Sequence, residues 1–204
     1  MAAGLWGGLA AITRPMGFLL TPALAWGLWR DCRRGGPLRP RDVIAVLLPV
    51  AGLGGYAAYL WAAFGDPLAF WAAHSVGWRV GFQLAVANYW REPYWVVTRL
   101  VRLHTYSHLL DAMRILLPPV FVVLTVQVFR RLGSVPGIYA SLAGVVGVFF
   151  ALESVGREFL AVTPAFAAAG LIAPRGTLGE ALRLLSFGLL LLLLFAFSTG
   201  RFVG

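Results

Sequence analysis

The chain of 204 residues is strongly apolar and basic: 60% of its residues are hydrophobic, 12% are charged, and its formal net charge is +9. A soluble domain usually carries about a quarter of its residues as charged side chains. This composition, with a mean hydropathy of +0.80, therefore favours an integral membrane protein. The arginines lie beside apolar runs, so topology and anionic lipid explain the charge better than a nucleic-acid partner.

Apolar runs of membrane-spanning length begin near the N-terminus. The first, Leu5–Trp29, is interrupted by Thr13-Arg14-Pro15. Because proline removes a helix amide and clashes one turn back, this run predicts either one kinked span or two half-helices. The next, Val43–Phe64, contains no charged residue. At about 1.5 Å per residue it reaches about 33 Å, enough to cross a hydrocarbon core of about 30 Å.

Four further apolar runs follow in the second half of the chain. They are Met113–Phe129, Val135–Leu152, Phe159–Ala173 and Ala181–Phe197. In lipid every backbone N–H and C=O must be satisfied within its own segment, so each run is predicted to be a helix. The expected fold is all-α, a polytopic transmembrane helical bundle of about six spans. We expect residues 1–204 to form a single transmembrane domain.

The positions of the arginines predict the orientation of this bundle in a cell membrane. The Arg30–Asp42 segment, called the arginine-rich loop below, contains Arg30, Arg33, Arg34, Arg39 and Arg41. By the positive-inside rule this loop is cytoplasmic, together with the turns at Arg130-Arg131 and Arg175. The long Gly65–Asp111 segment is then external. Within it, Tyr94–Met113 is predicted to form a helix along the membrane surface.

Arg14 is the most informative single charge. It lies within an apolar run, where a charge at membrane depth costs about 2.5–3.5 kcal/mol on insertion scales. A carboxylate, a water-filled cavity or an anionic ligand such as a lipid phosphate would offset that cost. The alternative interpretation is that Arg14 snorkels from near the outer interface.

The start of the predicted external loop holds further candidates. Asp66 precedes Pro67, a pair typical of a turn, and its carboxylate is expected to cap a helix that begins near Leu68. Trp78 and Arg79 follow in the same loop. They are expected either to form part of a sugar- or phosphate-binding surface or to anchor the chain at the interface.

Arg157 lies between two predicted spans, flanked by Glu153 and Glu158. Local ion pairing is one interpretation of this arrangement. The other is that Arg157 faces the same external cavity as Arg14 and clamps a phosphate.

Metal and hydrolase signatures are weak. His104 and His108 would share one helix face, but Asp111 is the only acid near them in the sequence. No metal site is assigned, no cofactor is expected with confidence, and a divalent metal is left open.

The sequence has no Gly-rich phosphate loop after a strand and no Gly-x-Ser-x-Gly elbow, so nucleotide hydrolysis and serine-hydrolase chemistry are unsupported.

Three segments, in this order, resemble the C-terminal half of polyprenyl-phosphate-sugar-dependent mannosyltransferases of the PIG-V (GPI mannosyltransferase II-like) family. The first is Leu9–Leu20 with Pro22–Trp26 after it, and the second is Phe64–Phe70 with Trp78 and Arg79. The third is Arg157–Phe166, which is similar to an arginine followed by a hydrophobic-Pro-hydrophobic helix in that family. The closing Gly200–Val203 also looks like the end of the family's chains.

The resemblance implies a GT-C-type glycosyltransferase that moves a hexose from a polyprenyl-phosphate sugar donor on the external face. The arginines among the candidates, Arg14, Arg79 and Arg157, would then offset charge on the departing lipid phosphate. Such enzymes usually place a catalytic aspartate in their first external loop, and this chain has no counterpart of that segment. We therefore expect a fragment or a separate N-terminal catalytic half as partner, and the catalytic residues stay unknown. The alternative is a non-enzymatic membrane protein, either a transporter subunit or an assembly scaffold.

Overall fold

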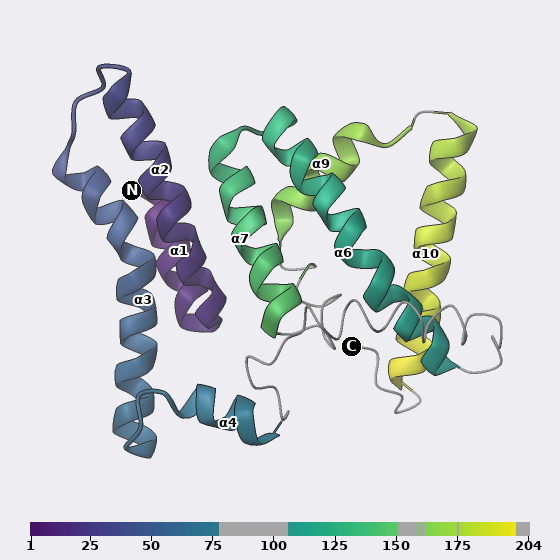
Figure 1. The fold of residues 1–204 in the computed structure, drawn as a ribbon, viewed down its shortest axis with the longest axis horizontal. Coiled ribbons are helices and arrows are strands. Elements are labelled where there is room, and N and C mark those ends of the chain that lie inside the picture. The colour runs from purple at the N-terminus through teal and green to yellow at the C-terminus, as the bar shows by residue number, and fades with distance from the viewer. Residues whose placement is uncertain (78–105, 151–158, 160–161, 175, 199–204) are drawn as a thin grey trace.

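A computed structural model of the chain describes residues 1–77, 106–150, 159, 162–174 and 176–198, and the elements in these ranges are all helical (Figure 1). In chain order they are α1 (Ala2–Thr13), the 3-10 helix η1 (Pro15–Leu19), α2 (Leu20–Arg33), α3 (Pro40–Phe64), α4 (Ala69–Gly77), α6 (Tyr106–Arg131), α7 (Ser134–Phe150), α9 (Thr163–Ile172) and α10 (Thr177–Ser198). The all-α prediction is confirmed for the described part of the chain.

Helix α3 matches the clearest predicted span. It has 25 residues, a mean hydropathy of 1.9 in its most apolar window, and only 17% of that window buried. Among the described residues it is the one helix that is both long and apolar enough to cross a membrane. Gly65 ends it in a left-handed conformation with φ 72°, which glycine adopts without steric cost.

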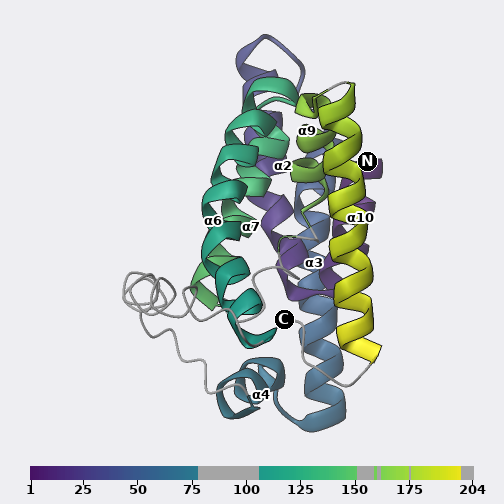
Figure 2. The same ribbon diagram turned by 90° about the vertical axis from the view of Figure 1, so that its right-hand side faces the viewer.

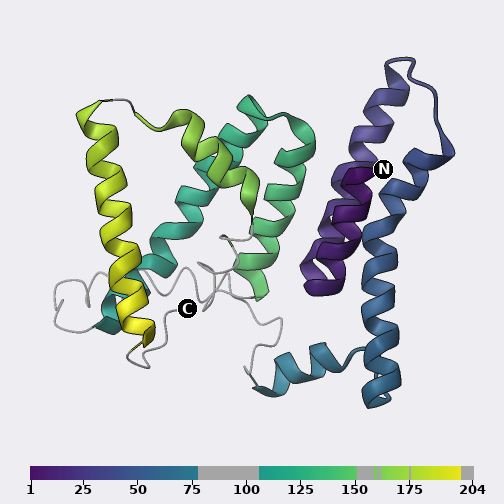
Figure 3. The ribbon, with the colours of Figure 1, turned by 180° about the vertical axis from the view of Figure 1, so that it is seen from behind.

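The interrupted first run forms a helical hairpin rather than one kinked span. Helices α1 and α2 run in opposite directions (Figures 1 and 3), so the single-span alternative is wrong. Pro15 disfavours a helical conformation for the residue before it, and Arg14 is extended with φ −145° and ψ 125°. After this break Gly17 lies directly against the backbone of Ala10 and Ala11, where any Cβ would overlap. The chain therefore turns back on α1.

Helices α1 and α3 lie side by side and run in the same direction. Gly4 lies against the carbonyl of Ala45, and Gly52 lies against the carbonyl of Gly8, so closely that a Cβ on either glycine would overlap the oxygen. Pro49, fully buried inside α3, has no N–H to offer the Ala45 carbonyl one turn earlier. At this close approach, the Cα–H groups of Gly4 and Gly52 are the weak donors available to the carbonyls of Ala45 and Gly8.

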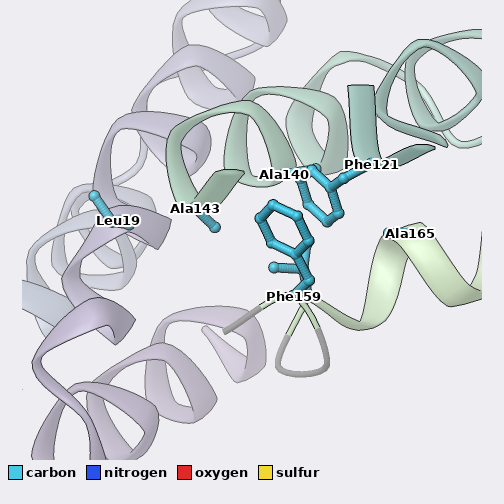
Figure 4. Packing of buried hydrophobic residues seen from close by; sticks show 7 residues of the cluster. Leu19, Phe121, Ala140, Ala143, Phe159 and Ala165 are labelled. Atoms are coloured by element: carbon cyan, nitrogen blue, oxygen red, sulfur yellow. The ribbon is translucent and has the colours of Figure 1, made fainter. Parts of the chain in front are cut away.

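A second packing centre joins α6, α7 and α9 to the hairpin (Figure 4). Phe121 of α6 stacks on Phe159, with ring centroids 4.0 Å apart and planes 15° apart. Ala140 and Ala143 of α7 are buried beside these rings, and Leu19 of η1 reaches the same cluster. The principal buried core therefore lies where the turn after α1 meets the second half of the chain.

Helix boundaries in the second half differ from the prediction mainly at α6. This helix covers Tyr106–Arg131, so residues 106–113 belong to the same helix as the predicted Met113–Phe129 run and not to a separate helix over Tyr94–Met113. The rest of that predicted surface helix lies outside the described residues. Helix α9 is shorter than the predicted Phe159–Ala173 run, because it begins at Thr163 with Pro164 in its first turn.

Candidate functional site

The turn at Arg14 is held by backbone and side-chain hydrogen bonds. The Arg14 N–H donates to the Ala10 carbonyl at 2.8 Å, and the Thr13 hydroxyl donates to the same oxygen at 2.9 Å. The Gly17 N–H donates to the Arg14 carbonyl at 2.8 Å. The main chain of the turn is thus satisfied locally, with Pro15 and Gly17 as the residues that shape it.

Arg14 lies close to the end of α3 that is remote from the arginine-rich loop. Because α1 and α3 are parallel and Gly8 contacts Gly52, Arg14 is about 9 Å beyond Gly52 along the α3 axis. At the same rise per residue, the position of Arg14 along this axis is about 9 Å before Phe64, the last residue of α3. The half-buried arginine is therefore inside the length of α3, near one end.

Tyr139 of α7 and the turn after Arg14 share one packing centre. Tyr139 is half-buried and packs against the aromatic and alanine cluster, as does Met16 of the turn. The half-buried Arg14 therefore lies at a turn whose next residues enter an apolar cluster. A guanidinium fork next to an apolar wall suits an anionic group carried on a hydrocarbon chain.

Asp66 takes the local role predicted for it. Its Oδ1 accepts a hydrogen bond from the Leu68 N–H at 2.8 Å, and its carbonyl accepts one from the Ala69 N–H at 3.2 Å, where α4 begins. Figure 2 shows α4 beside the C-terminal end of α3. Asp66 and Arg14 therefore lie toward the same end of α3, Asp66 exposed and Arg14 half-buried.

Three of the five candidate residues, Trp78, Arg79 and Arg157, lie outside the described residues. His104 and His108 do as well. Phe159, two residues after Arg157, belongs to the same buried cluster as Leu19. In the part of the chain that the structure describes, no three His, Cys, Asp or Glu side chains gather at a possible metal site.

The structure reveals a polar contact that sequence reasoning missed. Ser134, the first residue of α7, accepts hydrogen bonds from Arg30 Nη1 at 2.8 Å and from Trp26 Nε1 at 3.2 Å. Nearby, Gly27 leaves room for Val135. From the sequence, Arg30 is interpreted through membrane topology alone. Its contact with Ser134 has no local sequence signal, because the two residues are more than a hundred positions apart.

We expect Ser134→Ala to lower the free energy of unfolding by about 1–2 kcal/mol, because two donors on α2 lose their common acceptor. Thermal unfolding of the purified protein in detergent measures this change. Ser141→Ala is the matched control on the same helix, since its hydroxyl donates only to the Gly137 carbonyl one turn back. Equal destabilisation by both substitutions would contradict a special role for Ser134.

Comparison with known proteins gives no relative: no family model, no curated protein and no solved structure matches this chain. The candidate site is therefore assessed from the geometry of this chain alone.

Proposed function

We propose that this chain is a multi-pass membrane component of a GT-C-like, mannosyltransferase-type enzyme. Arg14 would bind the phosphate of a polyprenyl-phosphate sugar on the external face. One observation carries the proposal: a half-buried arginine at a proline-enforced hairpin turn, near the end of α3 remote from the arginine-rich loop. A guanidinium there has the charge and the fork of donors that a lipid phosphate requires.

The distribution of apolar surface supports a membrane setting. Large apolar side chains are exposed on α1, α3 and α10, including Trp6 at 71%, Trp61 at 67% and Leu184 at 72%. Further exposed valines line α6. Soluble monomers rarely present a contiguous apolar patch larger than a few hundred Å². Lipid acyl chains are the simplest solvent for helices of this kind.

The placement of the arginines supports several passes with one orientation. In Figure 1 the α2–α3 loop, the α6–α7 turn and the start of α10 lie at the same end of the molecule. Each carries arginine, with Arg130 and Arg131 ending α6 and Arg183 in the first turns of α10. The Arg14 turn and the Asp66 end of α3 lie at the other end. By the positive-inside rule the first end would be cytoplasmic and the second external.

Glycosyl transfer requires two kinds of catalytic group. A base must deprotonate the acceptor, and cations must offset the negative charge that develops on the departing lipid phosphate. Arg14 would be such a cation, with Arg79 and Arg157 as further contacts. Asp66 is already engaged by the Leu68 N–H. We therefore propose that the base comes from a separate N-terminal catalytic half rather than from Asp66.

A sugar-transfer assay tests this function. Membranes from cells that express the chain with its neighbouring genes would receive a polyprenyl-phosphate mannose donor with a labelled sugar. We expect label to pass to an acceptor only when this chain is present. Transfer that is unchanged by deleting the chain would exclude the proposal.

Reporter fusions test the orientation independently of activity. A fusion after Asp66 should report an external location, and a fusion within the arginine-rich loop at Gly36 should report a cytoplasmic one. The reverse result would place Arg14 near the cytosolic face and remove its access to an external donor.

The Arg14 hairpin also keeps a transporter subunit as the second candidate, because transporters use discontinuous helices as binding sites. Helix α9, only 10 residues long and beginning at Thr163-Pro164, is another short segment of this kind. Uptake of a labelled sugar phosphate into vesicles without any transfer of sugar would favour this alternative over the enzyme.

A further inference from the structure

A cavity of about 460 Å³ opens at the end of the molecule that carries the arginine-rich loop. Its walls come from α1, α2, α3 and the loop between α2 and α3, and Val135 of α7 closes one side. Helix α2 starts next to the Arg14 turn and ends at this loop. The charged opening of the cavity and the proposed donor site therefore lie toward opposite ends of α2.

The cavity has an apolar wall and a charged rim. The wall is lined by Ala3, Leu24, Leu28, Ala45, Val46 and Val135. The rim is lined by Met1, Asp31, Arg39, Arg41 and Asp42. A ligand that fills such a cavity needs an aliphatic chain and a polar headgroup in one molecule.

The charges at the rim favour an anionic headgroup. Arg41 Nε lies 3.8 Å from Asp42 Oδ1, and Arg30 Nε lies 4.0 Å from Asp31 Oδ1, so each carboxylate already has a cation beside it. Arg39 is exposed at the rim and has no ion-pair partner among the described residues. The surrounding loop carries five arginines against two aspartates. The local potential is therefore positive, and the Arg39 guanidinium is available to a phosphate.

We propose that this cavity binds one anionic phospholipid from the surrounding leaflet. Its phosphate would lie on Arg39 and Arg41, and one acyl chain would lie along Leu24 and Leu28. The proposal requires α3 to span the bilayer, which places the cavity at headgroup depth, and it does not depend on sugar transfer. A free phosphate ion has no chain to fill the apolar wall, so the lipid and not the ion is the ligand.

Native mass spectrometry of the detergent-purified protein tests the site. The probes are phosphatidylglycerol, phosphatidylcholine with the same acyl chains, and inorganic phosphate. We expect one saturable phosphatidylglycerol, weaker binding of phosphatidylcholine, and no displacement by inorganic phosphate. In Arg39→Ala the dissociation constant for phosphatidylglycerol should rise about five-fold, the effect of one arginine near an anionic surface.

Arg34→Ala is the matched control, because it removes the same charge from the same loop but does not line the cavity. We expect it to change the dissociation constant less than two-fold. Ala3→Trp, which fills the apolar wall without changing charge, should abolish the saturable lipid while the melting temperature shows that the protein is folded. Equal weakening by Arg39→Ala and Arg34→Ala would overturn the proposal in favour of diffuse surface attraction. Equal binding of phosphatidylcholine, or displacement by inorganic phosphate, would overturn it as well.

Discussion

Arg14→Ala is expected to lower sugar transfer about 100- to 1,000-fold, the loss typical when one preorganised donor to a developing negative charge is removed. The physical reason is the setting of the side chain, which is half-buried at the turn between α1 and η1. Water replaces a guanidinium poorly at such a position. Initial rates with a labelled polyprenyl-phosphate sugar, measured at several donor concentrations, give kcat and KM separately.

Two further variants separate a phosphate-binding role from a structural one. Arg14→Lys keeps the charge but loses the bidentate fork, so we expect activity between that of the wild type and Arg14→Ala. Arg183→Ala removes an exposed arginine that pairs with Glu180 at 2.6 Å on α10 and should leave transfer unchanged. The melting temperature of each variant is measured beside its activity, so that a loss of folding is distinguished from a loss of transfer. Full activity in Arg14→Ala would rule out the donor-phosphate role.

Gly52→Leu is expected to produce the largest loss of stability, about 3 kcal/mol. A side chain at this buried position would overlap the carbonyl of Gly8, so α1 and α3 would have to separate. Separation would move the Arg14 turn, because α1 leads directly into it. Thermal unfolding in detergent measures the loss, and Gly52→Ala should give a smaller loss in the same direction.

Gly54→Leu is the control on the same helix. No atom lies within 4 Å of the position that its Cβ would take, apart from the helix itself. Replacing an exposed helical glycine with leucine improves helix propensity by about 0.8–1.0 kcal/mol. We therefore expect unchanged or slightly higher stability. A comparable loss in Gly54→Leu and Gly52→Leu would show that the close approach of α1 and α3 is not what makes Gly52 necessary.

Much of the local structure follows from residues close together in the sequence. The uncharged run Val43–Phe64 predicts α3 to its last residue and misses only its first turn, which begins at Pro40, since lipid requires a helix wherever the chain is apolar for long enough. Asp66 before Pro67 predicts the cap at Leu68, because an aspartate side chain reaches the backbone two residues on. The break at Pro15 was predicted in the same way.

The direction of the chain after that break was not predicted. Proline specifies an interruption, whereas the reversal depends on Gly17 meeting the backbone of Ala10 and Ala11. Nor did the sequence indicate that Tyr139 of α7 and Met16 of the turn would pack against the same cluster. Helices that are apolar on every side carry no periodicity to show which face packs inward.

The amino-acid sequence by itself determined the all-helical content of the described residues, the long apolar α3, the cap at Asp66 and the grouping of arginines between apolar runs. These features depend on interactions within a few residues and on how long and how apolar each run is. The tertiary structure alone decided the hairpin at Arg14, the pairing of Ser134 with Arg30 and the cavity beside Arg39. Each of these requires helices distant in the chain to approach closely, which glycine and alanine contacts permit and local propensity does not encode.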